Sequence, residues 1–153
     1  MGPVYGYKNH VNVDKKHKLI RQYAVTDAAV HDSQVLTAVL LPAEAGREIW
    51  ADSAYRSEAI EAQLKTKRLR SKIHQKGARH TSLTAQQKTH NRARSRIRAR
   101  VEHVFGHQVT AMGGKLIRTI GLVRARIKIG LKNLAYNFQR FLVLTRPLKA
   151  QGA

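Results

Sequence analysis

The spacing of apolar residues changes along the chain, and this change limits the folds that it can adopt. Residues 5–13 alternate and are rich in aromatic and β-branched side chains, a pattern that predicts a strand. Residues 14–18 are polar and predict a turn, and residues 19–25 predict a second strand that forms a hairpin with the first. From about Thr84 onward the apolar spacing becomes helical. The sequence therefore predicts a sheet first and long helices afterwards.

Shorter elements are expected between these two parts. After the hairpin we expect a helix that Asp32 or Ser33 caps and that Pro42 and Gly46 end. Its apolar stripe is Val35, Leu36, Val39 and Leu40. The remaining short elements are a buried strand over residues 47–51, a helix over residues 57–64 and a strand over residues 72–74. This order predicts an α/β fold with a mixed sheet flanked by helices.

Two long helices are expected in the second half. Polar and basic residues over 75–90 suggest a loop against DNA, and the helical spacing returns from about Thr84. The break between the two helices falls at Gly113 and Gly114, and the last helix should cover residues 123–144. The apolar stripe of the first helix is Ile97, Val101, Val104 and Phe105. The apolar face of the last helix is Ile127, Leu131, Leu134, Phe138 and Phe141.

Charge is distributed unevenly along the chain, whose formal net charge is +20. Residues 1–62 hold seven basic and eight acidic side chains, whereas residues 63–153 hold 22 basic side chains and one acidic one. A near-neutral half joined to a strongly basic half points to a polyanionic partner, and nucleic acid is the usual one. A solvated basic surface, or association with the ribosome, is the alternative.

Composition excludes several classes of protein. The chain has no cysteine, which rules out disulfide scaffolds and thiolate metal sites and fits a reducing compartment. Its 153 residues suit one domain. No apolar run approaches the roughly 20 residues that span a bilayer, and the N-terminus lacks a signal-peptide pattern. We therefore expect a cytoplasmic protein that is not attached to a membrane.

Asp52 is the first candidate for a functional carboxylate. It follows the apolar run over residues 49–51, and ligands of α/β sheets gather outside the carboxyl ends of strands. A carboxylate at that position could hold Mg²⁺, which prefers oxygen ligands. The alternative interpretation is that Asp52 caps the turn that follows it.

Glu102 is the only acidic residue of the basic half. On a helix it lies at the flank of the apolar face, beside Arg98 four residues earlier, which predicts a semi-buried carboxylate. A carboxylate weakens a DNA-binding surface, so we expect Glu102 to have a role that offsets the repulsion. Metal ligation in phosphodiester chemistry is such a role. A structural Glu–Arg pair is the alternative.

Five segments resemble, in order, motifs of the bacterial insertion-sequence DDE transposases. They are YGYKNHVNVD (residues 5–14), VTDAAVHD (25–32), DSAY (52–55), RVEHVFG (100–106, with Arg98 completing an R-x3-E core) and NLAYN (133–137). Each motif is weak by itself, but together they make a specific match over residues 5–144. In two places the chain departs from the pattern. Ser95 stands where some relatives have Tyr, and Val109 stands where Lys is common.

The resemblance implies a ribonuclease-H-like fold with Mg²⁺ (or Mn²⁺) held by Asp, Asp and Glu, where Asp52 and Glu102 are the second and third carboxylates. It implies nicking at transposon ends and strand transfer, double-stranded DNA as partner, a homodimer as one arrangement, and a place at the bacterial nucleoid. The family's first catalytic Asp precedes the segment at residues 5–14, so we expect the fold to lack its first strand. Residues 1–146 would form a partial catalytic domain and residues 147–153 a flexible tail.

Activity in this chain alone is therefore in doubt, and two alternatives remain open. One is a non-catalytic DNA-binding remnant of a transposase, and the other is a basic RNA-binding protein. Trp50 is expected in the core. The residues expected to contact DNA are Arg92, Arg94, Arg96, Arg98, Arg100, Lys72, Lys76 and Arg79.

Overall fold

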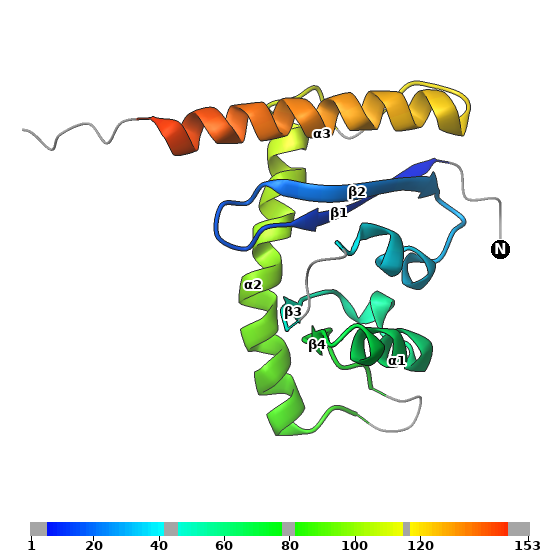
Figure 1. Cartoon of the computed structure of the whole chain (residues 1–153), viewed down its shortest axis with the longest axis vertical. Helices are drawn as coiled ribbons and strands as arrows, with labels where there is room; N and C mark the ends of the chain where they lie inside the picture. Colours follow the sequence, from blue (N-terminus) through cyan, green and yellow to red (C-terminus); the bar gives the residue numbers. More distant parts are fainter. Residues whose placement is uncertain (1–5, 42–45, 78–81, 115–116, 147–153) are drawn as a thin grey trace, which may run out of the picture.

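The computed structural model describes residues 6–41, 46–77, 82–114 and 117–146 (Figure 1). Its elements are β1 (Tyr7–Val13), β2 (Ile20–Asp27), η1 (Asp32–Gln34), η2 (Leu36–Val39), β3 (Glu48–Ile49), η3 (Ser53–Tyr55), α1 (Glu58–Thr66), β4 (Arg70–Ser71), α2 (Ala85–Thr110) and α3 (Leu122–Thr145). This is a mixed α/β order, as the sequence predicts. Pro42, Arg79 and the tail expected over residues 147–153 lie outside the described residues.

The first sheet is the predicted hairpin. Strands β1 and β2 pair antiparallel from Tyr7 opposite Asp27 to Val13 opposite Ile20, with an irregularity near Val13. At the turn, one carboxylate oxygen of Asp14 accepts from the backbone N–H of His17 at 2.6 Å. The hairpin and its polar turn are confirmed.

The second sheet is a parallel pair made by β3 and β4. Its regular part is short, but the backbone hydrogen bonds continue beyond it. Lys72 N–H donates to Ile49 O at 2.8 Å, and His74 N–H donates to Ala51 O at 3.1 Å. The strands predicted over residues 47–51 and 72–74 are therefore this pair, although its regular pairing is at Glu48–Ile49 and Arg70–Ser71.

The helix expected after the hairpin is replaced by two 3₁₀ helices, η1 and η2. The predicted stripe at Val35, Leu36, Val39 and Leu40 is buried as expected. β-Branched residues lose rotamer freedom in an α-helix, which lowers the cost of leaving that conformation here. The predicted cap is wrong as well. The side chain of His31 accepts from Ser33 N–H, while Asp32 pairs with Lys8 at 3.0 Å.

Helix α2 begins at a capping box, in which Thr84 and Gln87 each bond the other's backbone N–H. The predicted loop over residues 75–90 is wrong from Ala85 onward, because α2 begins there. In Figure 1 this helix runs past the hairpin and the β3–β4 pair, beside both. Of its predicted apolar stripe only Val104 is fully buried, while Ile97, Val101 and Phe105 are half-buried.

Helix α3 lies across the hairpin and the end of α2 (Figure 1). Its buried residues are Ala125, Ile129, Asn133 and Tyr136. A Cβ atom at Gly130 would lie 2.5 Å from the hydroxyl of Tyr23, so the close approach of α3 to β2 requires glycine at that position. The predicted apolar face is wrong. Ile127, Leu131, Leu134, Phe138 and Phe141 are each between 51% and 62% exposed.

The core has two parts. One lies under α1 and the β3–β4 pair and contains Leu64 and Ile73, and the other lies between the hairpin, α2 and α3 around Tyr136 and Val104. Buried amides link the second part. Asn133 bonds Asn9 and accepts from Gln108 at 2.9 Å. Within the described residues, no helix is both long enough and apolar enough to cross a membrane.

Candidate functional site

Asp52 lies where the β3–β4 ladder ends. One carboxylate oxygen accepts from the backbone N–H of Ser53 at 2.6 Å and so caps η3. The other oxygen accepts a hydrogen bond from the guanidinium of Arg98, which α2 carries. The capping interpretation of Asp52 is confirmed, and the carboxylate still has an oxygen that faces a second element.

The same guanidinium reaches Glu102. Its other terminal nitrogen donates to Glu102 Oε1 at 2.9 Å, so the predicted Arg98–Glu102 pair is present. The predicted semi-burial of Glu102 is wrong, because its side chain is 62% exposed. Asp52 is 50% exposed. One arginine thus gathers both predicted carboxylates on one face of the protein.

The chemistry of this pair suits a hard divalent cation in kind but is short in number. Carboxylate oxygens are the ligands that Mg²⁺ prefers, and one or two carboxylates plus substrate phosphates are its usual ligands. Among the described residues, no group of three or more His, Cys, Asp and Glu side chains could hold a metal ion. The arrangement therefore offers two oxygen-bearing side chains, with Arg98 bonded to both.

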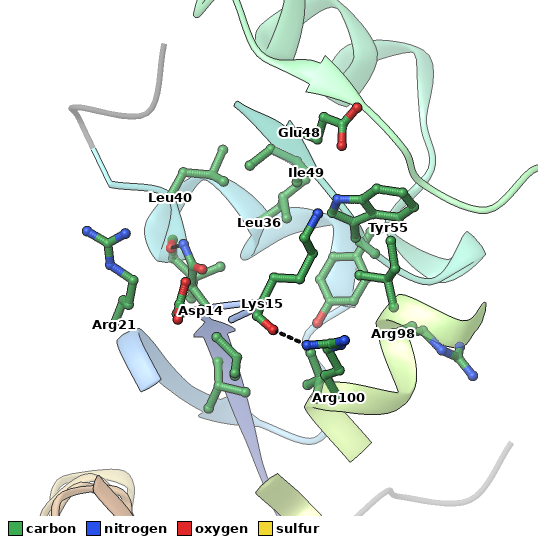
Figure 2. Close-up of a pocket in the computed structure, with 18 of the residues that line it drawn as sticks. Asp14, Lys15, Arg21, Leu36, Leu40, Glu48, Ile49, Tyr55, Arg98 and Arg100 are labelled. Atoms are coloured by element: carbon green, nitrogen blue, oxygen red, sulfur yellow. Dashed lines mark hydrogen bonds between the residues drawn. The ribbon is translucent and has the colours of Figure 1, made fainter. Parts of the chain in front are cut away.

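A cavity of about 760 Å³ lies beside the pair. Strand β1 and the turn after it line one side, and residues 46–52 line the other. Arg98 and Glu102 also contribute to its wall. Figure 2 shows Leu36, Leu40 and Ile49 around one part of the cavity, with Lys15 and Arg100 in another. Trp50, expected in the core, instead lines this cavity, with the ammonium of Lys15 5.7 Å from its ring.

A buried histidine that the sequence analysis did not single out lies on the cavity wall. His10 Nε2 is 2.9 Å from Thr26 Oγ1, and its Nδ1 is 3.1 Å from the hydroxyl of Tyr55. Burial lowers the pKa of His10 and raises the pKa of Tyr55 to about 12. The available signal was the alternation of the strand, which puts His10 on the same side as Lys8 and Asn12.

Stability should respond to pH through His10. Burial lowers its pKa below the usual 6.5, while nearby Asp32 acts in the opposite direction and Lys8 adds to the lowering. The unfolded chain therefore binds a proton at pH values where folded His10 stays neutral. The free energy of unfolding should be fully retained above pH 6.5 and should fall as the pH drops below it.

Urea unfolding of the wild type and His10→Gln between about pH 7.5 and 5 tests this expectation. The variant should show a weaker dependence on pH. Asp14 and His103 also have lowered pKa values, but both remain in the variant, so the difference between the two proteins reports on His10. Parallel curves for the two proteins would contradict the assignment.

Contacts between α2 and the end of β4 fix Arg98 opposite Asp52. His74 is buried, and its Nε2 lies 3.1 Å from both Asn91 O and Ser95 Oγ, while Arg94 donates to Ile73 O at 2.6 Å. Ser95, the position where some relatives have Tyr, therefore serves here as a partner of His74. These bonds set the rotation of α2 that turns Arg98 toward Asp52.

The residues predicted to contact DNA divide into two groups. Arg94, Arg98 and Arg100 bond other parts of the chain, and Arg100 does so through Lys15 O at 2.6 Å. Lys72 pairs with Glu48 at 3.7 Å. The second group is exposed and makes no hydrogen bond or ion pair within the described part of the chain; it consists of Arg92, Arg96 and Lys76. Arg79 lies outside that part.

Comparison with known proteins agrees with this geometry. A family model described as the transposase DDE domain matches residues 3–138. This range includes Asp52, Arg98 and Glu102, the three side chains that the structure brings together. Neither the curated proteins nor the solved structures contain a match to the chain. Since the family model covers most of its residues, the chain belongs to the DDE domain family of insertion-sequence transposases.

Proposed function

We propose that this chain acts in DNA transposition, as part of a ribonuclease-H-like catalytic domain formed by residues 1–146. The reaction would be metal-dependent DNA strand cleavage followed by strand transfer at transposon ends. The observation that carries this proposal is the meeting of Asp52 and Glu102 on the guanidinium of Arg98. The two carboxylates come from elements 50 residues apart in the chain and share one face.

In this proposal Asp52 and Glu102 hold Mg²⁺ or Mn²⁺ together with phosphate oxygens of the DNA. The ion would activate the attacking oxygen and stabilise the leaving one. Arg98 positions both carboxylates before the ion binds and keeps them from repelling each other. Because the described residues supply two carboxylates at this place, we propose that full activity needs a further carboxylate from outside them.

The basic character of the chain supports duplex DNA as the substrate. Exposed Arg92 and Arg96 lie on α2, within two turns of Arg98 and its carboxylates. Phosphates bound there would pass close to the acidic pair, which is the placement that phosphodiester cleavage requires. We propose the bacterial cytoplasm, at the nucleoid, as the place of action.

Binding of Mn²⁺, followed by electron paramagnetic resonance, tests the metal site directly. The Asp52→Asn, Glu102→Gln double variant should bind Mn²⁺ about tenfold more weakly than the wild type, because it loses both anionic ligands. The matched control is Asp27→Asn, Glu58→Gln, which removes two exposed carboxylates elsewhere. Equal loss in both double variants would contradict a shared site at Asp52 and Glu102.

A second candidate is a non-catalytic DNA-binding remnant of a transposase. The bonds of Arg98 to both carboxylates favour it, since they satisfy the pair without a metal. Nicking of supercoiled plasmid with Mg²⁺ or Mn²⁺ separates the two candidates. Cleavage that the double variant abolishes supports the enzyme, whereas plasmid binding without Mn²⁺ uptake or cleavage supports the remnant.

A further inference from the structure

We propose that the cavity between β1 and β3 is a slot for one extended polypeptide strand, which would pair with both edges and join the two sheets into one. The described strands form two separate two-stranded sheets, β1–β2 and β3–β4. The cavity lies between residues 9–15 of one sheet and residues 46–52 of the other. This inference concerns a binding partner, and it holds whether or not the chain cleaves DNA.

The edge of β1 that faces away from β2 can receive a strand. Ala28 N–H donates to Gly6 O at 2.9 Å, which fixes the phase of the antiparallel ladder. Because bonding alternates along such a ladder, the backbone groups of His10 and Asn12 face β2, and those of Asn9 and Val11 face the opposite edge. No other described strand pairs with that edge.

The edge of β3 is open in the same way. Its parallel ladder uses the carbonyls of Arg47, Ile49 and Ala51 as acceptors toward β4. The backbone groups of the residues between them, Glu48 and Trp50, therefore face the cavity. Two rows of backbone donors and acceptors that no described strand pairs thus border the same space. Such an edge is a template for another strand, and here a single strand would meet two of them.

Apolar side chains cover the two faces of this space. Leu36, Val39 and Leu40 line it from η2 and the residue after it, and Ile97, Val101 and Phe105 line it from α2. The stripe of α2 is half-buried because this space lies under it. Protein interiors contain few voids larger than a water molecule, so a cavity of about 760 Å³ between apolar faces calls for an occupant.

The chemistry of the walls selects the occupant. Apolar walls on both faces require a strand with apolar residues on both faces, such as a central strand carries. The buried Nε–H of Arg98 has no acceptor within the described part of the chain, and a strand carbonyl would supply one. Carboxylates of Asp14, Glu48 and Glu102 also line the cavity, which disfavours a nucleic acid as occupant.

A peptide of stated sequence provides the test, and the single tryptophan of the chain is the reporter because Trp50 lines the cavity. The probe is acetyl-Ser-Gln-Val-Ile-Val-Thr-Val-Ser-Gln-amide, an uncharged strand-forming segment. Its control has proline at the central valine, which removes a ladder donor and disrupts the strand. We expect saturable change of Trp50 fluorescence with the probe, and binding by the control peptide weaker by about tenfold.

Two protein variants identify the place of binding. Val101→Lys puts a charge on the wall of the cavity and should abolish the fluorescence change, whereas Val123→Lys, on the exposed side of α3, should leave it intact. Circular dichroism shows whether each variant is folded. If Val101→Lys fails to fold, Arg100→Gln at the same wall replaces it, with Arg124→Gln as its control.

Hydrogen exchange of the wild type gives an independent readout that needs no variant. Bound probe should slow exchange at the amides of Val11 and Trp50 by about tenfold or more, because those amides would gain ladder hydrogen bonds. The amides of His10 and Asn12, already bonded to β2, should change little. Equal protection of both sets, equal binding of the two peptides, or no binding of either would overturn the proposal. These outcomes are independent of Mn²⁺ uptake and plasmid nicking.

Discussion

Binding of this chain to duplex DNA should weaken by about a thousandfold or more when salt rises between about 50 and 200 mM. A loss of this size is expected for a protein that neutralises about six to ten phosphates, because each contact releases condensed counterions. The chain has the charge for it, with 29 Lys and Arg against 9 Asp and Glu. Fluorescence anisotropy of a labelled duplex over a series of salt concentrations measures the slope.

The exposed arginines of α2 should account for part of that slope. Replacing Arg92 and Arg96 with alanine should reduce the slope of log K against log salt by about 1.8, at roughly 0.9 for each phosphate that the protein no longer neutralises. The matched control replaces Lys65 and Lys67, two exposed cations at the end of α1, with alanine. Equal reductions in the two double variants would show that net charge, and not the surface of α2, determines binding.

Local signals in the sequence were sufficient for much of the fold. The polar turn after β1 and the alternation around it predict the hairpin, because both features act between residues that are near one another in the chain. The start of α2 is also local, since Thr84 and Gln87 close a capping box across three residues. The type of most elements follows from such signals, while η1 and η2 depart from the expected α-helix.

The buried face of α3 could not be read from its apolar spacing. The helix turns Asn133 and Tyr136 toward the hairpin, where Asn133 bonds Asn9 and the Tyr136 hydroxyl donates to Lys18 O at 2.9 Å. Gly130 lets the helix approach Tyr23 closely. Polar side chains thus define the packed face, and a hydrophobic pattern gives them no weight. Their partners are more than 100 residues away in the chain.

The candidate site shows the same division. The motifs at residues 52–55 and 100–106 identify Asp52 and Glu102 as a pair, and the structure places both carboxylates on Arg98. The exposure of Glu102 depends on what lies over α2, which helical spacing does not contain. The number of arginines on α2 likewise predicted a DNA surface without telling Arg92 and Arg96, which are exposed, from Arg94 and Arg100, which bond the protein itself.

Tyr136→Ala should destabilise the protein by about 3–5 kcal/mol, the usual cost of deleting a large aromatic side chain from a core. Tyr136 is 1% exposed and packs with Ile20 and Val104, where the hairpin, α2 and α3 meet. Its ring also makes an edge contact with His107. Since small domains have only about 5–15 kcal/mol of stability, much of the population could unfold. Urea unfolding followed by circular dichroism measures the loss.

Two further variants make this measurement decisive about the packing of α3. Tyr136→Phe keeps the ring and removes only the hydrogen bond to Lys18 O, which should cost about 1 kcal/mol. Phe138→Ala deletes an equally large ring two residues away, but that ring is 62% exposed, so the change should stay within about 0.5 kcal/mol. If Phe138→Ala were as damaging as Tyr136→Ala, the face predicted from apolar spacing would be the buried one. A small effect at Phe138 with a large one at Tyr136 would instead establish that α3 packs on the hairpin through Asn133 and Tyr136.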